Sequence, residues 1–228
     1  MEPTSFRHVV VAIDGPAASG KSTVARTLAR RLGFAYVNTG AMYRAVTWYA
    51  LENGGGAIDE DDVLRRLGAA KLECKIVNSE SRFSIDGFDP TPHLLSEPVN
   101  QNVSRISAIA EVRKQLVALQ RATACDRNVV MEGRDIGSAV FPETPYKFYI
   151  DASAEVRAQR REKQGLQDSI GQRDQMDSTR RTSPLVIAED SHVIDSSHLT
   201  IDGVVGEIVG RLKLKGLAVQ DVTFQRAD

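Results

Sequence analysis

The chain has 228 residues, 42% of them hydrophobic and 26% charged, with a formal net charge of −1. This is enough apolar material for one domain with an ordinary core, and the near-zero charge gives no indication of a general attraction to nucleic acid or anionic membranes. The two cysteines, Cys74 and Cys125, lack the CxxC spacing of a metal or redox site. The apolar run from Val9 ends before Asp14, which is too short for a signal peptide or a membrane span. We therefore expect a single cytoplasmic domain over residues 1–228.

Strand and helix patterns alternate through the N-terminal part of the chain. Residues 9–13 form an unbroken apolar run, which is typical of a strand buried on both faces of a parallel sheet. Residues 21–32 carry apolar side chains at every fourth position and are followed by Gly33, which predicts a helix that ends there. A strand over 34–37 and a helix over 41–52 come next. This order favours an α/β sheet with crossover helices.

The middle of the chain departs from this alternation. An acidic helix is predicted over 59–68 and a hairpin over 71–85, and three prolines between 90 and 98 predict the absence of regular structure there. We interpret residues 60–100 as an insertion. The alternation then resumes, with helices over 111–123, 154–163 and 201–212 and strands over 129–131, 146–150 and 192–194.

A glycine-rich segment directly after the first strand fits the pattern GxxxxGK[ST] at every fixed position. Its glycines let backbone N–H groups turn toward phosphate oxygens, Lys21 can bridge the β- and γ-phosphates, and Ser22 can bind Mg²⁺. A glycine-rich turn without a ligand is the alternative, but the position between a buried strand and an amphipathic helix favours a P-loop. The residues expected to hold the donor nucleotide are Gly15, Pro16, Ala17, Ala18, Ser19, Gly20, Lys21, Ser22 and Thr23.

A P-loop alone indicates nucleoside triphosphate binding, which GTPases, ATPases and kinases share. The NKxD motif that reads guanine does not occur in the chain, which favours a small kinase. Arg134 follows a predicted strand, and Arg157 and Arg161 share one helix face, so these arginines suit a second anionic ligand. Two alternatives stay open at this point. One is a kinase for another acceptor, with Asp135 as a base for a hydroxyl group, and the other is a nucleotide-dependent regulatory switch.

Three further segments carry a family resemblance. Residues 38–44 read NTGAMYR, residues 132–137 read EGRDIG, and residues 173–180 read RDQMDSTR. Together with the P-loop they resemble the motifs of bacterial cytidylate kinases, in the same order, from about residue 9 to residue 210. Asn38 stands where that family commonly has an aspartate, so the negative charge is lost there while hydrogen-bonding capacity remains.

The resemblance implies the P-loop nucleoside monophosphate kinase fold, an α/β architecture with a five-stranded parallel sheet flanked by helices. It implies a monophosphate-binding region over 40–104, enlarged by the insertion, and a short lid over 157–175. ATP with Mg²⁺ is the implied donor, with Ser22 on the metal and Asp14 or Glu132 contacting it through water. CMP and dCMP are the implied acceptors. The protein is expected to be a monomer without nucleic-acid or membrane partners.

The resemblance also implies roles for individual residues. Ser104, Arg113 and Asp135 would contact cytosine, whose N4 amino donor suits a carboxylate, whereas the O4 acceptor of uracil does not. Catalysis would depend on Lys21, Arg134, Arg157 and Arg161. The acceptor-binding residues carried over are Thr39, Tyr43, Arg44, Ser104, Arg113, Arg134, Asp135, Arg173, Asp177 and Arg180, with Arg44 and Arg134 at the phosphate and Arg173 and Asp177 at the ribose.

Overall fold

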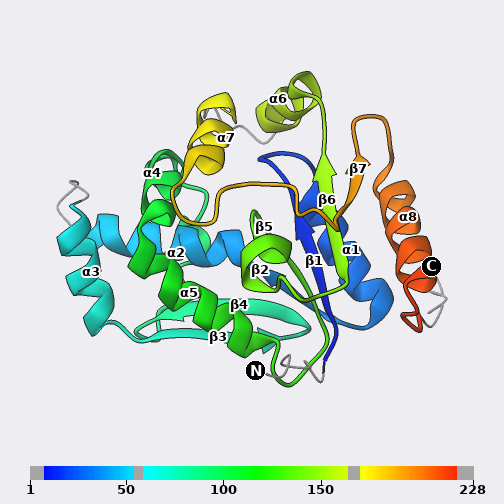
Figure 1. Ribbon diagram of the computed structural model, residues 1–228. Helices are drawn as coiled ribbons and strands as arrows, with labels where there is room; N and C mark the ends of the chain where they lie inside the picture. Colours follow the sequence, from blue (N-terminus) through cyan, green and yellow to red (C-terminus); the bar gives the residue numbers. More distant parts are fainter. Residues whose placement is uncertain (1–7, 54–58, 164–169, 220–228) are drawn as a thin grey trace, which may run out of the picture.

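The computed structural model describes residues 8–53, 59–163 and 170–219. Its strands form one sheet of seven in the order β3-β4-β2-β5-β1-β6-β7 (Figure 1). The strands are β1 (Val10–Asp14), β2 (Ala35–Asn38), β3 (Leu72–Val77), β4 (Glu80–Ile85), β5 (Val129–Gly133), β6 (Tyr146–Asp151) and β7 (His192–Asp195). The run from β2 to β7 is parallel throughout, as predicted. The predicted count of five is wrong for the whole sheet, because the hairpin of the insertion extends it.

The β3–β4 hairpin joins the sheet at the edge of β2. Its own strands pair antiparallel, and β4 is parallel to β2, with Tyr36 opposite Glu80. The backbone N–H of Tyr36 also donates to the carbonyl oxygen of Ser79 at 2.8 Å. Without the hairpin, β2 would leave a row of backbone groups unpaired at the edge of the sheet. The insertion is therefore part of the main sheet.

The helices surround this sheet, and their bounds differ from the predicted ones by at most two residues where a helix was predicted. The structure adds α4 and α7, which the sequence pattern does not predict. The helices are α1 (Lys21–Leu32), α2 (Thr39–Asn53), α3 (Glu60–Ala69), α4 (Glu97–Ala108), α5 (Ala110–Thr123), α6 (Ala154–Lys163), α7 (Ile170–Thr179) and α8 (Ile201–Leu214), with short turns of helix at η1 (Thr91–His93) and η2 (Ile136–Val140).

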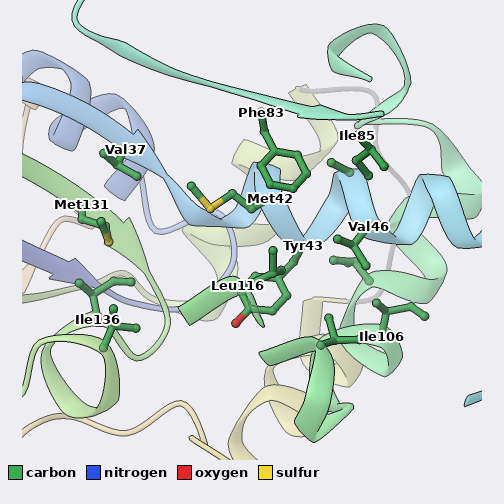
Figure 2. Close-up of a cluster of buried hydrophobic side chains, with 14 of the residues drawn as sticks. Val37, Met42, Tyr43, Val46, Phe83, Ile85, Ile106, Leu116, Met131 and Ile136 are labelled. Atoms are coloured by element: carbon green, nitrogen blue, oxygen red, sulfur yellow. The ribbon is translucent and has the colours of Figure 1, made fainter. Parts of the chain in front are cut away.

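Successive residues of β1 point to opposite faces of the sheet, and both faces are buried. Val10 and Ala12 lie in a core cluster with side chains of α2, α4 and α5, whereas Val11 and Ile13 pack with α1 and α8. In Figure 2, α2 lies between Phe83 of the hairpin on one side and Ile106 of α4 and Leu116 of α5 on the other. Because both faces need apolar side chains, the strand shows no alternation in the sequence.

Helix α4 corrects the expectation that the prolines prevent regular structure. Pro98 lies in the first turn of α4, where the missing N–H would have no partner within the helix. Pro90 and Pro92 lie at the start of η1. The prolines therefore begin helices here, and α4 carries the predicted substrate residue Ser104.

The predicted lid corresponds to the end of α6 and the start of α7, while residues 164–169 between them lie outside the described residues. Both helices lie beyond the carboxyl ends of the central parallel strands (Figure 1). Among the helices that the structure describes, none has the length and apolar character needed to cross a membrane.

Candidate active site

The P-loop connects β1 to α1 at the carboxyl edge of the sheet. At Gly15, a Cβ would lie 2.1 Å from the carbonyl oxygen of Ile150 in β6, so only glycine fits so close to that strand. Gly20 precedes α1 with φ 89°, a left-handed conformation that glycine adopts without strain. Ser22 and Thr23 lie in the first turn of α1. The predicted donor residues thus form one loop that ends at a helix N-terminus, an arrangement suited to phosphate.

Lys21 and Asp14 are buried charges at the base of this loop. Nζ of Lys21 donates to the carbonyl oxygen of Pro16 at 2.8 Å, and burial lowers the pKa of Lys21 to about 7. The carboxylate of Asp14 accepts two backbone N–H groups at the start of η2, each at 2.8 Å. Burial raises the pKa of Asp14 to about 7, against the effect of these two hydrogen bonds. A bound phosphate would supply the negative charge that favours a protonated Lys21.

Arg134 follows β5 and lies against the P-loop. Its Nη1 donates to the carbonyl oxygen of Gly15 at 2.9 Å, and its Nε pairs with Oδ2 of Asp177 on α7 at 2.9 Å. Burial alone would raise the pKa of Asp177, but Arg134 holds it below its usual range. The hydroxyl group of Ser104 donates to the other oxygen of Asp177 at 3.3 Å. Asp177 therefore connects the P-loop side of the site to α4.

Arg157 approaches the P-loop from α6. Its Nη1 lies 3.4 Å from the carbonyl oxygen of Ala17 and also pairs with Asp174 of α7. The other oxygen of Asp174 accepts the backbone N–H of Ala17 at 3.3 Å. Arg173 belongs to the same charged cluster, because it is one of the cations that lower the pKa of Lys21. The predicted catalytic residues Lys21, Arg134 and Arg157 are thus brought together.

Asp135 and Arg113 form a buried ion pair, with side chains 5% and 3% exposed. The guanidinium carbon of Arg113 lies 5.4 Å from the ring centre of Tyr43. Burial raises the pKa of Asp135, although Arg113 and Arg180 oppose the shift. Arg180 donates to the hydroxyl oxygen of Ser107 at 3.4 Å.

Three donors in this cluster have no hydrogen-bond partner among the described residues: Nε of Arg113 and both Nε and Nη2 of Arg180. A buried guanidinium N–H without a partner is expensive, so native proteins rarely leave several together. The cluster therefore offers free donors to an acceptor-rich ligand, next to the predicted base-binding carboxylate.

Arg44 of α2 and Arg161 of α6 converge on Asn100 of α4. Nη1 of Arg44 donates to Oδ1 of Asn100 at 2.6 Å, and Nη2 of Arg161 donates to the same oxygen at 3.5 Å. The carbonyl oxygen of Leu94 accepts a further bond from Arg44 at 3.0 Å. Arg44, predicted to bind the phosphate, and Arg161, predicted to lie in the lid, therefore bring two positive charges together at Asn100.

The candidate metal donors are all oxygen atoms. The hydroxyl group of Tyr36 donates a hydrogen bond to Oε1 of the buried Glu132 at 3.1 Å, and the hydroxyl group of Thr39 donates to the carbonyl oxygen of Glu132 at 2.7 Å. Among the described residues, no group of three or more His, Cys, Asp and Glu side chains could hold a metal ion. A small number of oxygen ligands fits Mg²⁺, because this ion keeps several coordinated waters and binds largely through nucleotide phosphates. Ser22, Asp14 and Glu132 are the residues that could contact it.

Several polar residues of the site were not predicted from the sequence. Asn100 and Ser107 lie on α4 seven positions apart, with Ser104 between them, so the three share one helix face. This polar stripe would have been visible if α4 had been predicted. Asp174 was missed because it contacts Ala17, which is far away in the chain, and Arg157 of another helix. Asn38, the departure from the family pattern, caps α2, since its Oδ1 accepts the backbone N–H of Ala41 at 3.0 Å.

Residues 11–214 match a protein-family model described as cytidylate kinase. The cytidylate kinase of Limosilactobacillus fermentum is 44% identical over 219 residues, which cover 91% of this chain and 96% of the relative. That of Desulforamulus reducens is 44% identical over 213 residues, covering 89% and 96%. That of Bacteroides fragilis is 40% identical over 212 residues, covering 86% and 93%. The family match extends from β1 to the end of α8.

Proposed function

Because the chain belongs to the cytidylate kinase family, we propose that it transfers the γ-phosphoryl group of ATP to CMP, and also to dCMP, to give CDP or dCDP and ADP. The observation that best supports this function is the buried ion pair of Asp135 and Arg113, placed at the same edge of the sheet as the P-loop. A P-loop alone would fit many enzymes. A buried carboxylate beside guanidinium groups that each keep at least one nitrogen without a partner, within the part of the chain that the structure describes, fits a polar base and its nucleotide.

Cytosine matches this pair by its hydrogen-bonding pattern. Its N4 amino group can donate to the carboxylate of Asp135, while N3 and O2 can accept from Arg113 and from the hydroxyl group of Ser104. Uracil would place its O4 against the carboxylate, where two acceptors face each other without a proton. A buried site made for one pattern can reject the other strongly, because its polar groups are left unpaired.

The sugar and phosphate of the acceptor are assigned to residues around this ion pair. Arg173 and Asp177 would hold the ribose, Arg44 and Arg134 would hold the α-phosphate, and Arg180 would reach the phosphate region. Arg44 comes from α2 and Arg134 from the end of β5, so the phosphate would lie between the base-binding residues and the P-loop. In this arrangement residues 40–104 make the monophosphate-binding region and residues 157–175 the lid.

The chemistry needs positioning and charge stabilisation rather than a base. The acceptor phosphate of CMP is already ionised near neutral pH, so one of its oxygens can attack the γ-phosphorus of ATP directly, and the bond from that phosphorus to the leaving ADP oxygen breaks. Lys21, Arg134, Arg157 and Arg161 would stabilise the charge on the transferred group. Mg²⁺, when bound, neutralises charge on the β- and γ-phosphates. Ser22 would hold the metal directly, with Asp14 or Glu132 contacting its waters.

The test is ADP production from ATP·Mg²⁺ with a panel of acceptors: CMP, dCMP, UMP, AMP, GMP and none. We expect a larger kcat/KM with CMP and dCMP than with the other acceptors, and we expect the Asp135→Asn variant to lose much of the preference for CMP over UMP. The Lys21→Met variant provides the inactive control. Equal turnover with every monophosphate, or turnover only without an acceptor, would contradict the proposed function.

A further inference from the structure

We propose that Asp174 takes the place of a donor phosphate oxygen at the P-loop of the empty enzyme, and that it holds Arg157 there until the nucleotide arrives. The inference rests on the proposed function, since it concerns the binding of ATP to this loop. Oδ1 of Asp174 accepts the backbone N–H of Ala17 at 3.3 Å, and Oδ2 pairs with Nη1 of Arg157. One carboxylate from α7 therefore contacts both a P-loop amide and a predicted catalytic arginine.

Backbone N–H groups of a P-loop are directed at phosphate oxygens, and a carboxylate oxygen presents them with the same charge and the same kind of acceptor. ATP cannot bind at Ala17 while Asp174 occupies its N–H group, because two anions would compete for one donor. Binding of the triphosphate must therefore move Asp174 away. Removing its negative charge should make the empty loop a better site for ATP.

The same contact explains how Arg157 is aimed before the nucleotide binds. Its Nε donates to the carbonyl oxygen of Ala152 at 3.0 Å, its Nη1 lies 3.4 Å from the carbonyl oxygen of Ala17, and Asp174 completes this set. When a phosphate replaces the carboxylate, Arg157 exchanges one anion for another with little movement. Asp174 thus orients Arg157 only until the nucleotide binds.

Helix α7 has a second attachment that does not involve Asp174. Asp177, one turn later, pairs with Arg134, and its carbonyl oxygen accepts the N–H of Leu185 at 2.8 Å. The Asp174→Asn variant should therefore keep α7 in place while it removes the charge. This separates the proposed effect from a general loosening of the site.

The experiment is calorimetric titration of ATP, without acceptor, into the wild-type protein and the Asp174→Asn variant, followed by steady-state kinetics with CMP. We expect the variant to bind ATP about 3- to 10-fold more tightly, the range for the loss of one competing hydrogen bond. We also expect KM for ATP to decrease along with the dissociation constant, because Asp174 competes with ATP for the same loop.

A matched control is Asp126→Asn, which removes the same charge from an exposed residue paired with Arg127, before β5 and so at the opposite end of the sheet. It should leave ATP affinity and kcat unchanged. Asp174→Glu keeps the negative charge and should return ATP affinity toward the wild-type value.

Unchanged or weaker ATP binding by Asp174→Asn would overturn the inference, as would equally tight binding by Asp174→Glu, because the charge would then not be the cause. A variant that merely misfolds cannot bind ATP more tightly than the wild-type protein, so the expected result has no trivial explanation. If the wild-type protein itself fails to bind ATP, the proposed function falls and this inference with it.

Discussion

Charged side chains that are buried near one another define this site at the scale of single residues. Lys21, Arg113 and Asp135 are all less than a tenth exposed, where a charge is stable only with a partner or a ligand. Arg113 has Asp135, and the pair leaves one guanidinium nitrogen without a partner among the described residues. Lys21 has the carbonyl oxygen of Pro16, a neutral acceptor. These cationic groups can therefore accept the negative charge that two nucleotides would supply.

The lowered pKa of Lys21 makes a prediction about pH. Burial brings this pKa to about 7, so at pH 8 the amine of the empty enzyme is largely neutral. The phosphates of ATP favour the charged amine, and binding at pH 8 must therefore take up a proton. Below pH 7 the amine is already charged and this uptake disappears. ATP affinity should accordingly fall by up to about tenfold per unit as the pH rises above 7.

Calorimetry in two buffers of different ionisation enthalpy at pH 8 measures this proton uptake directly. The Lys21→Met variant serves as the control, because a thioether has no proton to gain. Uptake that is absent in the wild-type protein, or equal in the variant, would show that Lys21 is charged in the empty enzyme.

Individual contacts of the site differ in how far the sequence predicts them. The P-loop residues are adjacent in the chain, so their pattern predicts their arrangement. The role of Asp174 could not be predicted from local sequence, because Ala17 and Arg157 reach it from other elements. That Arg113 and Asp135 contact the same base was expected only through the family resemblance, and their ion pair was not predicted, since no spacing rule connects a helix residue to a strand end.

At the scale of elements, glycine positions decide where the backbone can pass. Gly15 and Gly33 are both glycines at positive φ, at 153° and 66°, but they differ in surroundings. A Cβ at Gly33, at the end of α1, would meet nothing within 4 Å, whereas one at Gly15 would meet the backbone of β6 at 2.1 Å. At Gly33 a side chain would meet only backbone strain, whereas at Gly15 it would collide with β6.

The two alanine substitutions should therefore have different effects. Gly33→Ala should lower the free energy of unfolding by about 1 kcal/mol and leave ATP binding unchanged. Gly15→Ala must push the P-loop away from Ile150, so ATP affinity should fall by at least about tenfold, the consequence of displacing several phosphate-directed amides. Urea unfolding and ATP titration measure the two quantities. Normal ATP binding by Gly15→Ala would contradict the close approach of the loop to β6.

The elements that the sequence predicted well are those whose pattern is set locally. Helix α1 has its predicted bounds, because apolar spacing and Gly33 mark them. Helix α6 also begins and ends at its predicted residues. The proline pattern does not predict α4, because a proline in the first turn of a helix looks in the sequence like one that breaks structure. Helix α7 has little apolar periodicity, since it is held by Asp177 and Asp174 rather than by an apolar face.

The whole molecule combines a continuous parallel core with a hairpin at its edge. Strands β1 and β5 pair along their full length in the middle of the sheet, between two buried clusters. The hairpin is joined to β2 at one residue pair, and β3 at the edge is only partly buried. The hairpin also contributes Phe83 and Ile85 to the cluster around α2 (Figure 2). Its role is to cover α2, and none of its side chains is among those assigned to CMP.

This difference predicts the pattern of amide hydrogen exchange. Amides of β1 and β5 should exchange most slowly, since opening them requires global unfolding, whereas those of β3 should exchange through a local opening of the hairpin. CMP should slow exchange in α4 and α5, which carry Ser104 and Arg113, and leave β3 nearly unchanged. Mass spectrometry of peptic fragments with and without CMP measures both effects. Strong protection of β3 by CMP would mean that the insertion takes part in binding the acceptor, and the base pocket would then have to be extended toward the hairpin.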